Sequence, residues 1–576
     1  MRKKVKFYQP PDISDLKDLL LKSREKYGEK AALMYKKGKK WYSISYNELF
    51  YKTFSLGCFL ESIGMKKGTK VAIMSENRPE WAITYLAVAC GNGINVPIDK
   101  ELKSQEMFHI LYTTEAEIFV GSQKYMEMLL EFKDQLPKLK TLINMDLNGD
   151  KKIFLFDNVV NEGSKLFEKN KSKYPTIKVD PELPLSIIFT SGTTGSSKGV
   201  ILTQKNIVED IKGITQMIKV ESHYTLLSVL PLHHTYECTG GFLMPLACGC
   251  TIAYAESLKK IPDNLKEVKP HAMLAVPLLL EAVYKKVMKK IEEKGSKKFK
   301  IAKGIAAISE VFFKKNIRKK IFKPIHEGFG GNLKYLVSGG AAIDPEVSKG
   351  FRDLGILVLQ GYGLTETSPV IALNKDDFYK YDSAGLPLPQ VEIKIIDGEI
   401  CVKGPVVMKG YYNNPEATAE VIKNGWFHTG DLGFFDKDGF LYINGRKKSM
   451  IVTANGKNIY PEEIEAHLNK SPFILESIVW EGPEATKYCE EVHAIIVPDV
   501  EYFDQYLSKQ GKQMTEEIVE KILDHEVKKA CSKLASYKRV KKFTIHWNEF
   551  EKTTTKKIKR YLYTSKIRSI SSQSSK

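Results

Sequence analysis

The residues most able to do chemistry in this chain form a loop of glycines and hydroxyl side chains. The loop reads Thr190-Ser191-Gly192-Thr193-Thr194-Gly195-Ser196-Ser197-Lys198-Gly199 and follows the apolar run 185–190. Glycine lets a backbone turn its N–H groups toward a ligand, and the hydroxyl groups and Lys198 add donors and positive charge. The loop therefore predicts a cradle for phosphate oxygens. Its spacing differs from the G-x-x-x-x-G-K-[ST] of a Walker loop.

Five further segments of small, hydroxyl and charged residues follow this loop along the chain. They are Ser-Gly-Gly-Ala-Ala at 338–342, Tyr-Gly-Leu-Thr-Glu-Thr-Ser-Pro at 362–369, Trp-Phe-His-Thr-Gly-Asp at 426–431, Gly-Arg-Lys-Lys at 445–448 and Gly-Lys-Asn-Ile-Tyr-Pro-Glu-Glu at 456–463. The first two follow apolar runs of strand type, so we expect their side chains at the ends of strands. A histidine pair within 230–237 and a lysine cluster within 552–560 complete the candidates.

Short apolar runs alternate with helical patterns over most of the chain. We expect helices at 12–27, 46–63 and 79–91, and buried strands at 71–74, 94–98, 185–190, 225–230, 272–276, 333–337 and 356–359. Strands that alternate with helices favour a parallel sheet covered on both faces. The expected fold class is therefore α/β, with a large N-terminal domain of sheets sandwiched by helices.

The C-terminal part has a different pattern. Strand-like runs at 450–452, 474–479, 492–497 and 543–547 combine with helix-like runs at 461–468 and 516–534. This mixture predicts a small, mobile α+β domain. The Gly-Arg-Lys-Lys segment is the expected exposed link to it. We therefore expect a large domain over residues 1–445, a small domain over 449–576 and a hinge near 446–448.

Composition and cysteine usage restrict the class of protein. The 576 residues are 43% hydrophobic and 27% charged, which is an ordinary globular balance for a chain of two or more domains. The 8 cysteines form no C-x-x-C pair and the histidines do not cluster with them, so zinc and redox sites are not indicated. The basic N-terminus lacks the apolar segment of a secretory signal, and the longest apolar stretch, 241–255, is too short to span a bilayer. We expect a cytoplasmic protein.

Positive charge is concentrated in one segment of the chain. The net charge is +19, and residues 285–323 alone hold 15 Lys and Arg against 3 Glu. Apolar residues are interleaved with these charges, so the segment is either a solvated helical surface or an amphipathic face for peripheral contact with an anionic membrane. We expect no nucleic acid partner, because no nucleic-acid-binding motif accompanies the charge.

The ordered set of motifs resembles the superfamily of acyl-CoA synthetases, peptide-synthetase adenylation domains and beetle luciferases, over about residues 30–565. Segments 230–237 and 323–347 are most similar to long-chain fatty acyl-CoA synthetases. The resemblance implies a ligase that activates a carboxylic acid with ATP and Mg²⁺ as an acyl-adenylate and passes the acyl group to coenzyme A. The implied substrate is a medium- or long-chain fatty acid.

The resemblance assigns most motif residues to ATP. Seven residues of the loop would hold the β- and γ-phosphates: Thr190, Ser191, Gly192, Thr193, Thr194, Gly195 and Lys198. Tyr362 would stack on adenine, opposite a wall made of Gly339, Gly340 and Ala341. Asp431 would accept hydrogen bonds from the ribose hydroxyls, and Arg446 would reach the ribose or a phosphate. Glu366 would bind Mg²⁺, with Thr193 as a further ligand.

Three residues are implied in catalysis beside Glu366. Thr365 would touch the α-phosphate, and His234 would lie beside the acyl carboxylate without acting as a general base. Lys557 would enter from the small domain and bridge the carboxylate and the α-phosphate, since a positive charge lowers the repulsion between two reacting anions. A glycine usually precedes this lysine in the family. Lys556 stands there in this chain, although the spacing to Arg560 favours Lys557.

The resemblance also implies a rotation of the small domain. Lys448 matches the hinge, and after adenylation the rotation would withdraw Lys557 and bring Gly456, Lys457 and Asn458 toward the coenzyme A side. Ser197 stands where proline is frequent in the family, which implies a more mobile phosphate loop.

Two other functions remain open. A free-standing acyl-AMP ligase would carry the same motifs and use an acceptor other than coenzyme A. A non-catalytic membrane- or lipid-binding protein would keep the fold and use 285–323 as its main feature. The acid itself is also open between aliphatic and aromatic, because segments 235–245 and 276–280 would line either pocket.

Overall fold

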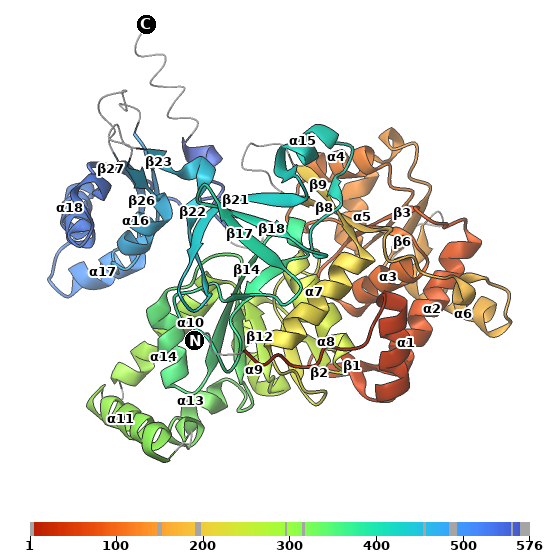
Figure 1. Cartoon of the computed structure of the whole chain (residues 1–576), viewed down its shortest axis with the longest axis horizontal. Coiled ribbons are helices and arrows are strands. Elements are labelled where there is room, and N and C mark those ends of the chain that lie inside the picture. Colours follow the sequence, from red (N-terminus) through yellow and green to blue (C-terminus); the bar gives the residue numbers. More distant parts are fainter. Residues whose placement is uncertain are drawn as a thin grey trace, which may run out of the picture.

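The computed structural model describes residues 5–146, 153–190, 197–293, 296–313, 317–452, 457–482, 492–553 and 557–564. Figure 1 shows a large body of sheets and helices and a smaller C-terminal body (blue), which lies beside strand β22 (Leu441–Arg446). The predicted α/β fold class is confirmed by this arrangement. In the described ranges, none of the helices has the length and apolar character that crossing a membrane requires.

The phosphate loop belongs to an eight-stranded sheet. In spatial order the strands are β19 (Gly410–Tyr411), β9 (Lys198–Thr203), β8 (Pro184–Thr190), β4 (Ile94–Pro97), β3 (Lys70–Met74), β5 (Ile118–Gly121), β6 (Thr141–Asn144) and β7 (Phe154–Leu155). Strands β8 to β7 of this order run parallel, and every residue of β4 and β5 is buried, as in a parallel sheet covered on both faces. Strands β8 and β9 form an antiparallel hairpin, and the loop 191–197 connects them.

A nine-stranded sheet carries the next two motifs. Its order is β16 (Leu386–Pro387), β15 (Val370–Leu373), β14 (Leu357–Gly363), β13 (Tyr335–Ser338), β12 (Ala272–Ala275), β10 (Thr225–Ser228), β11 (Thr251–Tyr254), β1 (Ala31–Lys37) and β2 (Lys40–Ser45). The predicted strands at 225–230, 272–276, 333–337 and 356–359 are confirmed. Strands β13 and β14 are parallel neighbours, so residues 339–341 and Tyr362 lie at the same edge of the sheet.

The large body contains helices that pack on these sheets or on one another. They are α1 (Leu16–Tyr27), α2 (Tyr46–Ser62), α3 (Pro79–Cys90), α4 (Ser104–Thr114), α5 (Gln123–Leu130), α6 (Phe156–Glu168), α7 (Gln204–Met217), α8 (Met244–Ala247), α9 (Ile261–Val268), α10 (Pro277–Glu293), α11 (Ser296–Phe313), α12 (Arg318–Ile321), α13 (Lys323–Gly328), α14 (Pro345–Asp353) and α15 (Pro415–Val421). The predicted helices at 12–27, 46–63 and 79–91 correspond to α1, α2 and α3. A serine and a glutamate form a capping box at the start of α2, which explains why that helix begins at Tyr46.

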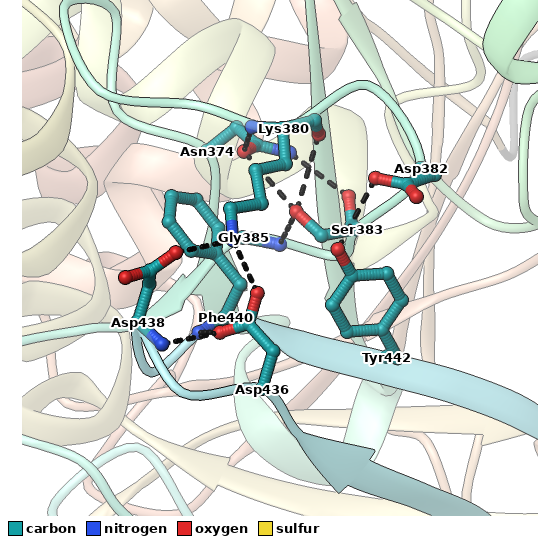
Figure 2. A network of polar contacts seen from close by, with 9 residues as sticks. All are labelled: Asn374, Lys380, Asp382, Ser383, Gly385, Asp436, Asp438, Phe440 and Tyr442. Atoms are coloured by element: carbon teal, nitrogen blue, oxygen red, sulfur yellow. Dashed lines mark hydrogen bonds and ion pairs between the residues drawn. The ribbon is translucent and has the colours of Figure 1, made fainter.

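A small antiparallel sheet links the large body to the C-terminal body. It consists of β17 (Glu392–Ile396), β18 (Glu399–Lys403), β21 (Trp426–Phe435), β20 (Ile422–Lys423) and β22. Figure 2 shows how the turn between β21 and β22 is held: the Lys380 ammonium binds the carboxylates of Asp436 and Asp438, and Asp436 accepts from the Phe440 N–H. Tyr442 on β22 donates to Asp382, 3.2 Å away. The hairpin that carries Asp431 and Arg446 is therefore fixed to segment 374–385.

The C-terminal body has its own hydrophobic core. Its elements are β23 (Ile451–Val452), β24 (Asn458–Ile459), α16 (Pro461–Leu468), β25 (Ile474–Glu481), β26 (Val492–Pro498), α17 (Val500–Ser508), α18 (Glu516–Cys531) and β27 (Lys542–Ile545). Ile464, Ile496 and Leu523 are fully buried in this core. Ion pairs at 3.9 Å join the two bodies, Lys285 with Asp499 and Lys470 with Asp344. The limits 1–445 and 449–576 and the hinge between them stay predictions.

Candidate functional site

The two ends of the phosphate loop are paired in the β8–β9 hairpin. The Thr190 hydroxyl lies 3.5 Å from the Lys198 carbonyl oxygen, and the Lys198 ammonium lies 4.9 Å from the centre of the Tyr411 ring. A cation over an aromatic face is attracted to it, which directs Lys198 toward Tyr411. Five predicted residues of the loop lie outside the described residues: Ser191, Gly192, Thr193, Thr194 and Gly195.

Glycines shape the edge where β13 ends. A Cβ atom added to Gly339 would lie 2.9 Å from the ring of Tyr236, whose hydroxyl donates to the Val337 carbonyl oxygen at 2.9 Å. Gly340 has a φ of +86°, which side chains rarely adopt. The Tyr236 ring therefore packs against Gly339, whereas a Cβ on Gly340 would meet only Val276, 3.9 Å away. Tyr362 stands on the neighbouring strand, and the adenine slot between these segments stays a prediction.

Asp431 contacts two of the other predicted residues. Its Oδ2 accepts a hydrogen bond of 2.6 Å from the Tyr362 hydroxyl, and its Oδ1 lies 2.7 Å from the Arg446 Nε. The Asp431 and Arg446 residues face each other across the β21–β22 pair. Burial, followed by the charge of Asp431, raises the pKa of Tyr362, so this hydroxyl remains a donor. Each carboxylate oxygen keeps a second lone pair for a further donor such as a ribose hydroxyl.

Thr365 and Glu366 lie in a short 3-10 turn after β14. The Glu366 Oε1 accepts from the Tyr411 hydroxyl at 2.9 Å, and the Glu366 carbonyl oxygen accepts from the Met408 N–H at 2.8 Å. Tyr411 thus contacts both the carboxylate of Glu366 and the ammonium of Lys198. Sequence reasoning missed Tyr411, because only the pairing of β19 with β9 brings it to the phosphate loop.

The two adjacent histidines have different surroundings. His234 Nδ1 accepts from the Tyr236 N–H at 3.2 Å, so the neutral ring carries its proton on Nε2. Burial, together with the charges of His233 and Lys557, lowers the pKa of His234 to about 3. His234 is therefore a neutral donor, and its position beside the acyl carboxylate stays a prediction. His233 instead points its Nε2 at Asp99, 3.5 Å away.

Lys557 of the C-terminal body lies close to residues of the large body. Burial lowers its pKa, the nearby Arg446 lowers it further, and Asp431 and Glu366 raise it. The charge of Lys557 also lowers the pKa of His234. By its accessible surface, however, the residue is exposed to solvent. Lys557 therefore lies within electrostatic range of His234, Glu366, Asp431 and Arg446.

The segment that carries Lys557 is fixed at its base. The Thr553 N–H donates to the Lys557 carbonyl oxygen at 2.8 Å, and the Lys557 N–H donates to the Thr553 hydroxyl at 3.1 Å. Arg560 forms an ion pair with Glu465 on α16 and donates to the Val479 carbonyl oxygen at 3.2 Å. Arg560 therefore holds the lysine segment on the small body. Lys556 lies outside the described residues.

The residues predicted for the hinge and for coenzyme A lie in and after the turn that follows β22. Lys448 is exposed in a 3-10 turn over Lys447–Ser449, directly after β22. Lys457 lies 4.7 Å from the ring centre of Tyr537, a residue of the small body, and Asn458 is exposed on β24. Gly456 is outside the described residues. Their predicted roles stay predictions.

Comparisons with known proteins identify the family of the chain. Residues 20–412 match the profile of a family described as AMP-binding enzyme. The long-chain-fatty-acid–CoA ligase FadD15 of Mycobacterium bovis is 30% identical over 562 residues, 92% of each chain. The chloroplastic long-chain-fatty-acid–[acyl-carrier-protein] ligase AEE15 of Arabidopsis thaliana is 27% identical over 87% of this chain and 78% of its own.

The fold is also that of solved structures. The crystal structure of the anthranilate CoA ligase AuaEII in complex with anthranoyl-AMP superposes with a TM-score of 0.76 at 19% identity, over 98% of both chains. The family profile covers well over half of the sequence and includes the phosphate loop and the segment around Glu366. The chain therefore belongs to the AMP-binding enzyme family.

Proposed function

We propose that the protein is an ATP-dependent, AMP-forming carboxylate–CoA ligase that acts on medium- or long-chain fatty acids. One observation carries the proposal: Lys557 of the small body lies within electrostatic range of His234, Glu366, Asp431 and Arg446 of the large body. Such an arrangement places positive charge and neutral donors where a carboxylate and a phosphate would meet. Relatives that match over most of their length are named long-chain-fatty-acid–CoA ligases, which supports the choice of acid.

Two displacements make up the proposed reaction. A carboxylate oxygen attacks the α-phosphorus of ATP, an O–P bond forms, and the bond to the bridging oxygen breaks so that pyrophosphate leaves. The coenzyme A thiolate then attacks the acyl carbon, and a C–S bond replaces the C–O bond to AMP. The residues contribute mainly by positioning the groups and by stabilising the charge on phosphate.

In the first step Lys557 would lie between the carboxylate and the α-phosphate, and the His234 Nε2–H would donate to the acyl carboxylate. Asp431 and Arg446 would hold the ribose end. Glu366 fits a role in binding Mg²⁺, because one of its oxygens accepts from Tyr411 and, among the described residues, no Lys or Arg forms an ion pair with it. Thr193 is the second expected ligand, and the metal would offset phosphate charge.

The choice of acid is tested with a panel of substrates. Acetate, octanoate, palmitate, oleate, benzoate and a cinnamate are each given with ATP, Mg²⁺ and coenzyme A, and acyl-CoA and AMP are measured. We expect thioester with the longer aliphatic acids, because relatives that match over most of their length are named long-chain-fatty-acid–CoA ligases. A preference for benzoate would mean that the substrate is an aromatic acid rather than a fatty acid. Absence of both pyrophosphate release and ATP binding would leave the non-catalytic lipid-binding protein as the better description.

The acceptor is tested in the same assay. One relative is named as a ligase of acyl-carrier protein, so the free-standing acyl-AMP ligase is the second candidate. Pyrophosphate release without acyl-CoA, and acyl transfer to an added carrier protein, would favour that candidate. Stimulation of pyrophosphate release by coenzyme A, with equal amounts of thioester and AMP, supports the CoA ligase.

We also propose that helix α11 contacts anionic membranes. Ile301, Ile305 and Ile308 lie on one face of α11 and are 64%, 52% and 55% exposed. The opposite face is packed, since Ala306 is buried and Glu310 forms ion pairs with Arg318 and Arg352. Figure 1 shows α11 at the periphery of the large body. Exposed lysines on α10 and α11 complement a negatively charged lipid surface.

Vesicle sedimentation tests this contact. We expect binding to vesicles of phosphatidylcholine with phosphatidylserine and little binding to phosphatidylcholine alone, because each basic residue near the surface contributes about 1 kcal/mol. Replacement of Ile301 and Ile305 by serine should reduce binding, and the same change at Leu130, an exposed leucine on α5, serves as control. Equal sedimentation with both lipids would rule out the proposed surface.

A further inference from the structure

The buried carboxylate of Glu399 joins the ribose-binding strand to the hinge turn. Glu399 begins β18, and its side chain is only 9% exposed. Its Oε1 accepts from the Gly430 N–H at 3.0 Å, and its Oε2 lies 2.9 Å from the Lys447 ammonium and 3.4 Å from His428 Nδ1. These partners belong to β21 and to the turn after β22. One side chain therefore contacts both the part of β21 that precedes Asp431 and the turn that follows Arg446.

An irregularity in the sheet explains why β21 needs this carboxylate. Glu399 pairs with Leu432 while Cys401 pairs with His428, so β21 holds more residues than β18 over the same span. Gly430 lies in the extra stretch, with a φ of +72°. Such a bulge turns the following side chain out of the regular alternation and leaves an N–H without a strand partner. Glu399 accepts that N–H, and Asp431 comes next in the chain.

The contact with Lys447 reaches the hinge. Lys447 opens the 3-10 turn over Lys447–Ser449, which contains the proposed pivot Lys448. The Lys447 side chain is 53% exposed, yet its ammonium lies 2.9 Å from the buried carboxylate of Glu399. An anchored Lys447 stays with the large body, so a rotation can begin only at the next residue.

The titration of Glu399 agrees with this arrangement. Burial raises the pKa of its carboxyl, but the hydrogen bonds from Lys447, Gly430 and His428 outweigh burial, and the pKa lies below its ordinary value. The group therefore remains an anion despite its low exposure. An anion that is bound from both segments is a stronger link than a neutral carboxyl would be.

We propose that Glu399 is a positioning residue with two tasks: it holds the bulge that presents Asp431 to the nucleotide, and it fixes Lys447 as the last immobile residue before the pivot. The second task rests on the proposed function and on the predicted rotation of the small domain about the hinge near 446–448. Loss of Glu399 affects both tasks, and loss of the Lys447 ammonium affects only the second. A Glu399 variant should therefore bind nucleotide more weakly than a Lys447 variant, and both variants should show faster exchange in the hinge turn.

The test combines ATP titration by calorimetry with hydrogen–deuterium exchange of peptides covering 426–435 and 441–452. For Glu399→Gln we expect a dissociation constant for ATP raised about tenfold and faster exchange in both peptides, since a hydrogen-bonded charge is lost. For Lys447→Met we expect ATP affinity within about twofold of the unaltered protein and faster exchange only in the hinge peptide. Lys447→Arg should restore slow exchange.

Lys403→Met, an exposed lysine on the same strand β18, is the matched control and should change neither readout. Unchanged ATP affinity in Glu399→Gln would overturn the first task. Unchanged exchange of the hinge peptide in Lys447→Met would overturn the second, and this variant remains informative if Glu399→Gln does not fold. Neither readout requires turnover, so a protein that binds ATP but forms no thioester would refute the proposed function and leave this inference standing.

Discussion

Replacement of Lys557 by alanine should separate the two half-reactions. The lysine lies within electrostatic range of Glu366 and Asp431 and of the neutral donor His234, so it adds positive charge where the carboxylate would approach the α-phosphate. Two unit charges 4 Å apart at an effective dielectric constant of about 20 interact with about 4 kcal/mol. Contact of Lys557 with solvent weakens this attraction. We therefore expect a loss of about 10²–10³-fold in adenylation, as for removal of one donor from a developing charge.

The assay is the exchange of labelled pyrophosphate into ATP in the presence of a fatty acid, followed by single-turnover transfer from preformed acyl-adenylate to coenzyme A. Lys557→Ala should lose the exchange and keep the transfer within about threefold, because the lysine acts only in the first transition state. Lys556→Ala and Lys559→Ala are the matched controls and should retain exchange. Loss of exchange in Lys556→Ala with activity in Lys557→Ala would show that the neighbouring lysine enters the site.

The same residue predicts a pH dependence. Only the ammonium form of Lys557 can bridge two anions, and burial lowers its pKa from the ordinary 10.5. Exchange is therefore present below that lowered pKa and is lost as the pH rises through it, at a pH below 10.5. The profile of Lys557→Ala should lack this alkaline fall. An unaltered alkaline limb in the variant would refute the assignment.

Three further predictions concern residues around the site. Tyr411→Phe removes the hydroxyl that Glu366 accepts at 2.9 Å and keeps the ring beneath Lys198, so kcat for adenylation should fall about 3–10-fold with little change in KM for ATP, measured by pyrophosphate exchange. Gly339→Ala places a Cβ 2.9 Å from the Tyr236 ring, which should raise KM for ATP, whereas Gly328→Ala, where a Cβ meets nothing within 4 Å, should not. Burial raises the pKa of Glu237 from 4.5 to about 8, so its contribution to stability is complete below pH 4.5 and falls by about 5 kcal/mol as the pH rises to about 8. Glu237→Gln should flatten that dependence, and thermal unfolding from pH 5 to 8 tests it; parallel melting profiles of the two proteins would contradict it.

The parts of the fold that sequence alone predicted are those set by local pattern. Strands β10, β12, β13 and β14 were expected because short apolar runs bounded by turns have few other conformations in an α/β protein. Asp431 and Arg446 were expected from motifs, and the structure pairs them across neighbouring strands.

The residues that sequence reasoning missed depend on long-range pairing. Tyr411 reaches the phosphate loop because β19 pairs with β9, more than 200 residues earlier in the chain. Glu399 acts through a bulge in β21 that no period of apolar residues reveals. Local sequence does not reveal such a register, because the register depends on which strands pair with each other. The segment 285–323 was expected as either a solvated or a lipid-facing surface, and the choice between the two stays a proposal.

The position of Lys557 has a consequence for the order of events. In the proposed mechanism the lysine stands on a body of its own and fills the space between His234 and Glu366 while the acid is activated. A thiol that approaches by that space must wait until the lysine has left it. Two reactions that need the same space cannot occur at the same time. The lysine that occupies this space therefore sets the order of the two reactions, and no further control is needed. The reactive anhydride is then exposed to attack only after the group that made it has withdrawn.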